Sequence, residues 1–413
     1  MLTLHFFLHM RKSIIFAILL TATSGLLAET PKPILDIYGF VRNDFYYNSR
    51  QCEEGIDGVF HFFPKPARID NITGLDQNAV PQANMLSIAT RLGLNITGQP
   101  IFGATSSGKI ETDFAGFGVA NYVIRIRHAY MQLKWEKSTV LLGQTWHPMF
   151  GSVIPVTVSL NVGMPFQTFN RSPQLRFSHK LNDYFTATAA ATYQMQYTSG
   201  GPKGFSPNYL RNALVPNLFG GLEHRSKHWI NGAGIDFKVI KPDDKSLSSL
   251  SAIAYTQYTQ SKFIAKARVT LGQNLSDHLL ANGYGKTFDS STGEHGYTNQ
   301  NILSTWVNLV YGQKWQISVF GGYAQNLGSG MPLHADNGLF TIYSRGFYAD
   351  TQEMIDRMMR VSSTLTYNLP NITFGIEYNL TNVTYGKIRM DGRTDGNYGV
   401  NNHRVIGMVS YFF

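Results

Sequence analysis

The segment MLSIATRLGLNIT, residues 85–97, alternates between two kinds of side chain from end to end. One face is apolar apart from a threonine, and the other is polar or small: Leu86, Ile88, Thr90, Leu92, Leu94 and Ile96 against Ser87, Ala89, Arg91, Gly93, Asn95 and Thr97. A period of two held over about ten residues is long for an ordinary strand and suits a tilted strand that crosses a membrane. The segment therefore predicts a membrane-spanning strand with lipid on one face and water on the other.

The same alternation recurs along the chain, as in YFTATAAATYQMQY at 184–197, and it predicts sixteen strands. These are 34–48, 85–97, 103–114, 122–135, 139–145, 173–180, 184–197, 217–225, 229–240, 248–258, 261–274, 301–311, 315–326, 354–368, 372–386 and 403–413. Every second interval between them is a short turn, and most of the others are long. Short periplasmic turns and long extracellular loops are the layout of an outer-membrane barrel.

We therefore predict an all-β fold, a closed antiparallel transmembrane β-barrel of about 16 strands. In hydrocarbon every backbone N–H and C=O group must be paired within the protein, so strands can cross only if the sheet closes. A barrel of this size surrounds a lumen wide enough for water. No later apolar window reaches the length of about 18 residues that a transmembrane helix needs.

The two ends of the chain carry targeting signals. Arg11 and Lys12 precede an apolar run, which predicts a signal peptide at 1–28, starting at Met1 or Met10, and a single barrel domain at 29–413. The last segment, HRVIGMVSYFF, alternates and places Tyr411 and the terminal Phe413 on one face. This ending is similar to the signal that the barrel assembly machinery reads. We expect the outer membrane of a Gram-negative bacterium, with its lipids and lipopolysaccharide around the protein.

The composition limits the classes of partner. The net charge is +9, and such a basic balance is compatible with binding to nucleic acid, to a membrane surface or to anionic solutes. The chain has no lysine-rich tail, zinc-ligand spacing or RNA-binding motif, and it is exported, so nucleic acid is excluded. We predict no cofactor, no metal and no enzyme activity. Cys52, the single cysteine, is interpreted as a loop thiol that forms no internal disulfide.

Strand parity then places a basic excess inside the barrel. In YVIRIRHAYMQLKW, 122–135, Arg125 and Arg127 fall on the lumen face with Ala129, whereas Ile126, His128 and Tyr130 face lipid. The predicted pore-lining residues are Arg91, Lys109, Glu111, Asp113, Arg125, Arg127, Arg171, Arg176, Arg268, Arg360 and Arg404. Arginines in a narrow aqueous passage attract anions. Charge reversal at Arg125 and Arg127 would then weaken anion preference without preventing assembly. In the alternative, arginines pair with Glu111 and Asp113 and only stiffen the wall.

The third long loop, 146–172, is nearly uncharged and apolar. Such a loop would be an exposed hydrophobic patch on the outer surface. We expect it to fold into the lumen and to bring five side chains near a constriction: Trp146, His147, Phe166, Phe169 and Arg171. The alternative is a loop packed between subunits.

Four ordered motifs carry a family resemblance: KIETDFAG at 109–116, IRIRHAYMQL at 124–133, LLGQTWHPMF at 141–150 and RSPQLRF at 171–177. They resemble the first half of the DcaP-type porins, trimeric outer-membrane channels for small anionic organic molecules. The resemblance implies a homotrimer, with Arg125 and Arg127 in the lumen facing the third loop.

Two other functions stay open at this point. A lipid hydrolase of the outer wall would need a serine beside a histidine, and Ser106 would lie diagonally near His128 if the hairpin turned near residue 118. An adhesin or purely structural barrel would explain the long loops. The favoured function is passive diffusion of small, preferably anionic, solutes.

Overall fold

The computed structural model describes residues 33–55, 58, 60–116 and 123–413. The expected signal peptide, 1–28, lies outside the described residues. Sixteen of the described strands make the wall of the barrel: β1 (Ile34–Asn48), β5 (Arg91–Thr97), β6 (Thr105–Asp113), β7 (Arg125–Lys134), β8 (Ser138–Trp146), β9 (Arg171–Lys180), β10 (Phe185–Thr192), β11 (Asn217–Arg225), β12 (Trp229–Ile240), β13 (Leu247–Gln260), β14 (Phe263–Gln273), β16 (Glu294–Gly312), β17 (Trp315–Ser329), β22 (Glu353–Asn368), β23 (Ile372–Ile388) and β24 (Thr394–Phe412).

Shorter elements decorate the loops. They are β2 (Cys52–Gly55), β3 (Phe60–Pro64), β4 (Gln82–Leu86), β15 (Gly283–Asp289), β18 (Ala335–Asp336), β19 (Leu339–Phe340), β20 (Ile342–Ser344), β21 (Phe347–Tyr348), the helix α2 (Asn208–Asn212) and the 3-10 turns η1 (Pro148–Phe150) and η2 (Ser276–His278). No helix within the described ranges is long and apolar enough to cross a membrane.

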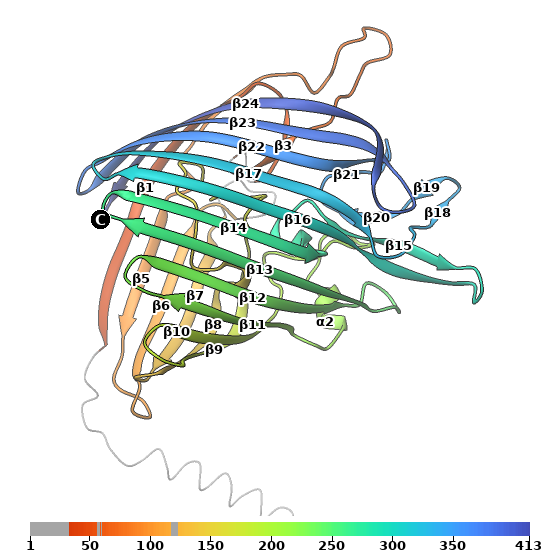
Figure 1. Cartoon of the computed structure of the whole chain (residues 1–413). Coiled ribbons are helices and arrows are strands. Elements are labelled where there is room, and N and C mark those ends of the chain that lie inside the picture. Colours follow the sequence, from red (N-terminus) through yellow and green to blue (C-terminus); the bar gives the residue numbers. More distant parts are fainter. Residues whose placement is uncertain (1–32, 56–57, 59, 117–122) are drawn as a thin grey trace, which may run out of the picture.

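The wall closes because the first strand pairs with the last. β1 is antiparallel to β24 through its second half, with Phe40 opposite Phe412, and to β5 through its first half. All other wall strands pair with their neighbours in sequence, also antiparallel. Figure 1 shows the tilted strands around the barrel, with the C-terminus at the end that carries the short turns. The predicted all-β, closed, 16-stranded antiparallel barrel is confirmed.

Alternation along the strands separates two environments. Ile235, Val307 and Ile376 point outward and are more than half exposed, whereas their neighbours Asp236, Asn308 and Glu377 point inward and are buried. An apolar outer band and a polar inner face are what a barrel in lipid requires.

The segment 85–97 departs from the predicted single strand. β4 ends at Leu86 and β5 begins at Arg91, and between them Ile88 and Ala89 turn inward, 5% and 4% exposed. The outward set is therefore confined to Leu92, Leu94 and Ile96. The two halves of the segment pair with different parts of β1.

The long connections lie at one end of the barrel and contain the interior packing. We label five of them loop 1 (49–81), loop 3 (147–170), loop 4 (193–216), loop 5 (274–293) and loop 7 (330–352), and we label the short connection 389–393 loop 8; the labels are names and not a count. Side chains of loops 1 and 3 form one hydrophobic cluster with inward residues of the wall: Phe60, Phe62, Phe63, Phe150, Phe166, Phe169, Trp306 and Phe320 belong to it. The interior is thus partly a packed core, to which loop 1 contributes as well as the third loop that was expected to fold inward.

Candidate functional site

The described residues form three cavities that share lining residues with one another. The outer cavity, about 840 Å³, is surrounded by loops 1, 4, 5 and 7. A middle cavity of about 210 Å³ shares Phe60 and Arg125 with it. A third cavity of about 290 Å³ shares Trp146 with the middle one.

The middle cavity has a charged wall, built by β5, β6 and β7. Arg125 donates from Nη2 to Oδ2 of Asp113 at 2.6 Å, and Arg127 donates to Oε1 of Glu111 at 2.7 Å and to Oδ2 of Asp113 at 3.1 Å. Arg91 Nε lies 3.5 Å from Oε1 of Glu111. Antiparallel register produces this cluster, because Arg91 is opposite Asp113, which is opposite Arg125. Three guanidinium groups meet two carboxylates, so the net charge of this wall is positive.

A β-bulge in β7 orients the side chain of Arg127 toward the interior. Glu111 is opposite His128 while Thr112 is opposite Ile126, so Arg127 is an extra residue in β7. Arg127 and His128 are 6% and 7% exposed and both point inward. The bulge shifts the alternation by one position.

Beyond the bulge the predicted facing of β7 is wrong. His128 bonds Thr145 with a ring nitrogen at 2.9 Å, and Tyr130 is opposite Lys109 on the inner face. Ala129 and Met131 take the outward positions instead, and Met131 is 50% exposed. Nothing in the sequence signals this bulge, because each half of β7 alternates regularly.

Lys109 extends the charged wall along β6. Its Nζ atom lies 3.9 Å from Oε2 of Glu111 and 4.8 Å from the centre of the Tyr38 ring. The Tyr38 hydroxyl donates to the same carboxylate oxygen at 2.8 Å. Glu111 is therefore shared by three basic side chains and a tyrosine, while Lys109 keeps part of its surface exposed.

Loop 3 forms the opposite side of the middle cavity. Residues 148–170 contain no charged side chain, and Ile154, Leu160 and Val162 line the cavity across from the arginines. The loop is held by the far wall: the Val156 N–H donates to Asn308 of β16 at 2.8 Å. A basic surface thus faces an apolar ridge.

Several predicted pore arginines hold loops in place. Arg268 donates to the carbonyl oxygens of Phe150, at 2.7 Å, and of Met149, and Arg360 donates to that of Met164 at 2.8 Å. Three more basic side chains bond carbonyls of loop 3 or of the strand end before it: Arg42 bonds Val158, Lys266 bonds Ile154 and Arg176 bonds Trp146 at the end of β8. Inward loops leave carbonyls without partners, and a guanidinium can only donate. These cations stabilise the loop path.

The predicted aromatic residues of the third loop gather around one arginine. Trp146 stacks on Phe150 with the ring centres 3.9 Å apart, and Phe169 meets Trp146 edge-on at 4.9 Å. The Arg171 guanidinium lies 4.7 Å from the centre of the Trp146 ring and donates to the Tyr197 hydroxyl at 2.7 Å. Arg171 is fully buried and lines none of the three cavities, so its contacts are with the stack.

Phe166 and His147 occupy the two ends of loop 3. Phe166 packs on Phe320 with the ring centres 6.2 Å apart. His147 lies with its Nε2 atom 3.0 Å from the Thr192 hydroxyl, and it also lines the third cavity. Arg176 and Glu223 line that cavity too.

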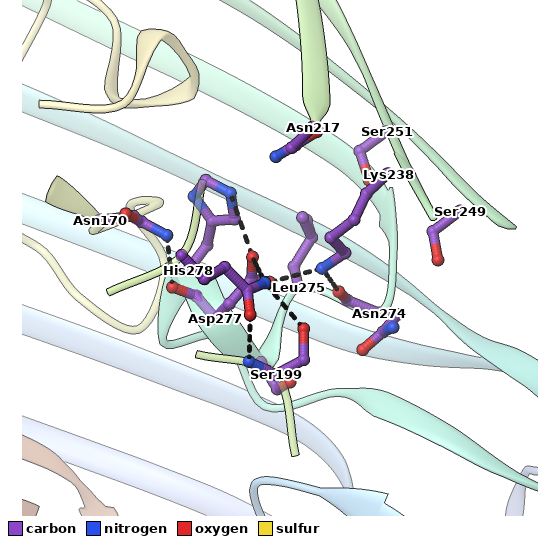
Figure 2. A network of polar contacts seen from close by, with 12 residues as sticks. Asn170, Ser199, Asn217, Lys238, Ser249, Ser251, Asn274, Leu275, Asp277 and His278 are labelled. Atoms are coloured by element: carbon purple, nitrogen blue, oxygen red, sulfur yellow. Dashed lines mark hydrogen bonds and ion pairs between the residues drawn. The ribbon is translucent and has the colours of Figure 1, made fainter. Parts of the chain in front are cut away.

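A buried polar network, drawn in Figure 2, fastens loop 5 to the wall. Lys238 of β12 points to Asp277 and donates to its Oδ1 at 2.6 Å, and both side chains are 1% exposed. Asn170 of loop 3 donates to the Asp277 carbonyl at 2.9 Å. Loops 3 and 5 are therefore tied to each other as well as to the barrel.

Sequence analysis missed the inward part of loop 1. The hairpin of β2 and β3 inserts beside loop 3, where Phe60 meets Phe169 edge-on at 5.4 Å. Arg360 donates to the Phe62 carbonyl at 2.6 Å, and Arg404 donates to the Gly58 carbonyl at 2.8 Å. The run FHFFP was the available signal, because such an apolar stretch in a long loop needs a buried partner.

The two residues of the predicted assembly signal lie at the seam of the barrel. Tyr411 is opposite Val41 and is 52% exposed on the outer face. Phe413 exchanges backbone hydrogen bonds with Gly39, at 3.0 and 3.1 Å.

Ser106 and His128, the pair that the alternative lipid hydrolase would need, do not lie side by side. Ser106 is opposite Leu133 near one end of β7, whereas His128 is opposite Glu111 and buried. In the described residues no three His, Cys, Asp or Glu side chains are placed to hold a metal ion.

Comparison with known proteins finds likeness in structure alone: no protein-family model matches the chain, and no curated protein sequence does. The outer membrane channel DcaP of Acinetobacter baumannii superposes with a TM-score of 0.68 at 19% identity, covering 92% of this chain and 97% of the channel. The fold is that of the DcaP-type porins. The porin resemblance found in the sequence is thus confirmed for the fold.

Other outer-membrane proteins share this fold more distantly. An anion-selective porin from Comamonas acidovorans has a TM-score of 0.55 at 10% identity, covering 92% of this chain and 100% of that porin. The trimer form of OmpT, an outer membrane protein of Vibrio cholerae, has a TM-score of 0.52 at 11% identity, covering 92% and 99%.

Proposed function

We propose that the protein is an outer-membrane porin through which small solutes, preferably anions, diffuse passively. One observation carries the proposal: inside a closed barrel, a wall with more guanidinium groups than carboxylates faces a loop segment without charge. A cation excess in a narrow passage raises the local concentration of anions and repels cations.

The ion pairs reduce the number of charges that act on solutes. Arg125 and Arg127 are neutralised in part by Asp113 and Glu111, so the anion preference rests on the excess supplied by Arg91 and Lys109. Both of these side chains are more exposed than the two arginines of β7. We expect a moderate anion preference from such a wall.

The remaining predicted properties belong to the same proposal. A homotrimer in the outer membrane of a Gram-negative bacterium, with lipid and lipopolysaccharide around it, agrees with the apolar outer band and with the trimeric porin of the same fold. No catalytic role is assigned, and a structural barrel or adhesin is the competing function.

Single channels in a planar bilayer test the proposal. Under a potassium chloride gradient, the reversal potential should have the sign of chloride selectivity. Cation selectivity would contradict the proposed role of the basic wall, and absence of any conductance from folded protein would favour the adhesin.

A further inference from the structure

Apart from Phe60 and Arg125, the lining of the outer cavity differs from that of the charged middle cavity. Rings and aliphatic side chains from loops 1, 4 and 5 line it: Phe60, Phe62, Met195, Tyr197, Phe205 and Leu279. Three charged side chains reach it, Glu54, Arg125 and Arg345. An apolar cavity with a few convergent polar groups is the usual form of a small-molecule site.

Arg345 of loop 7 is the charged group of this cavity that is best placed to bind a ligand. Its guanidinium carbon lies 4.2 Å from the centre of the Phe205 ring and 5.4 Å from that of Phe62. Its Nε atom donates to the Ser276 carbonyl at 2.9 Å, and this is its only hydrogen bond within the described part of the chain. The side chain is thus fixed by loops 1, 4 and 5, and its two Nη atoms are left for a ligand.

The other charged side chains of the cavity determine how many carboxylates a ligand can carry. Arg125 already binds Asp113 through two hydrogen bonds, at 2.9 and 2.6 Å. Glu54 adds a negative charge to the wall. A ligand with a single carboxylate finds one cation and an apolar surface, whereas a second carboxylate would have to lie against apolar rings or near Glu54.

We propose that the outer cavity binds amphipathic organic anions with one carboxylate, which Arg345 pairs while the apolar body lies against Phe60, Phe62 and Phe205. The inference rests on the proposed function, since it gives the porin a site that concentrates such anions above the basic wall. The stacked Arg345 is the residue that determines this specificity. A carboxylate binds a guanidinium through paired hydrogen bonds, which an amide side chain cannot reproduce.

Calorimetric titration of the full-length folded protein in lipid nanodiscs tests the site without relying on conductance. The probes are octanoate and the diacid of equal length, octanedioate, with empty nanodiscs as the blank. Octanoate should bind at least about tenfold more tightly, and butanoate, hexanoate and octanoate should gain roughly tenfold for each two methylenes added. Equal or tighter binding of octanedioate, or no saturable octanoate binding, would overturn the proposal.

Two variants assign the residues. Arg345→Gln keeps a donor for the Ser276 carbonyl and should weaken octanoate binding about tenfold. Phe205→Leu should weaken octanoate binding less and should reduce the dependence of affinity on ligand chain length.

The matched control is Arg389→Gln. Arg389 is an exposed loop 8 arginine paired with Asp391, and the variant should bind octanoate like the wild type. An Arg345→Gln protein that binds like the control would overturn the assignment. The chloride reversal potential is measured separately, so that a failure of the porin proposal is distinguishable.

Discussion

Arg127 binds two carboxylates at once and so decides how the charged wall responds to substitution. Its Nε atom bonds Glu111 and its Nη1 atom bonds Asp113, while the side chain is 8% exposed. Removing one partner from such a buried pair leaves an uncompensated charge, and this is costly. The expectation from sequence, that charge reversal here leaves assembly intact, does not take these bonds into account.

We predict that Arg127→Glu destabilises the folded barrel by roughly 3–5 kcal/mol, because it places three carboxylates together. The measurement is the temperature at which the compact form is lost in heat-modifiability electrophoresis. Arg91→Gln is the matched comparison, since the Arg91–Glu111 contact is longer, at 3.5 Å. It should keep most of the stability and shift the reversal potential toward cations. An Arg127→Glu barrel as stable as the wild type would contradict this account.

At the scale of elements, alternation predicted the wall strands well and the loops poorly. β1 has the predicted bounds, and 354–368, which could also have begun as a helical turn, is the strand β22. β16 and β24 begin before the predicted starts, at Glu294 and Thr394, because their outer ends leave the membrane and no longer need an apolar face. Inward loop packing could not be predicted, since it depends on partners from distant loops.

The candidate site shows the same difference between strands, which alternation predicts, and loops, which it does not. Parity assigned Arg91, Glu111 and Arg125 to the inner face, where all three line the middle cavity, because successive residues of a regular strand point to opposite faces. Which arginines face solutes and which hold loops depends on the path of loop 3, and a strand pattern contains no information about that path.

The loop 1 hairpin supplies the prediction at this scale. His61 is 1% exposed, and its Nδ1 atom accepts from Arg360 Nη2 at 2.9 Å. Burial, together with the charges of Arg360 and Arg404, lowers the pKa of His61 well below its ordinary value. Above about pH 6.5 His61 is neutral whether the hairpin is docked or detached, so docking of the hairpin does not depend on pH. Below that value the detached hairpin gains a proton on His61 that the docked hairpin does not, and docking is weakened.

We therefore expect the hairpin to detach more often at about pH 5 than at about pH 7.5. Cys52, 4% exposed in the same hairpin and the only cysteine, reports detachment through thiol labelling normalised to unfolded protein at each pH. Labelling should rise several-fold in acid. His61→Gln should abolish the pH dependence; if it persists in this variant, another group controls docking.

The whole molecule depends on one seam, where the chain's last residues meet its first strand. Phe413 exchanges two backbone hydrogen bonds with Gly39, and the Phe412 ring lies 5.7 Å from that of Phe40. The terminal residue therefore has a structural role in closure in addition to the predicted role in assembly.

Deleting Phe413 should lower the folded yield in two separable ways. Loss of the seam bonds should reduce refolding into detergent micelles, where no assembly machinery is present, by a few-fold. Loss of a recognition signal would reduce the yield in cells only. Tyr411→Phe, which keeps an aromatic ring at the outer face, is the control for both measurements. A normal yield in both settings would show that Phe413 contributes to neither.

The same seam has a kinetic consequence. Its partners lie at opposite ends of the chain, so the pairing of β1 with β24 is the contact of greatest sequence separation in the wall. Contacts of long sequence separation form slowly, because the loss of chain entropy comes before the gain from pairing. Until the last strand arrives, β1 and β23 each present an unpaired edge that can join another chain. The lifetime of that open sheet, rather than the stability of the closed barrel, should set how much protein is lost to aggregation.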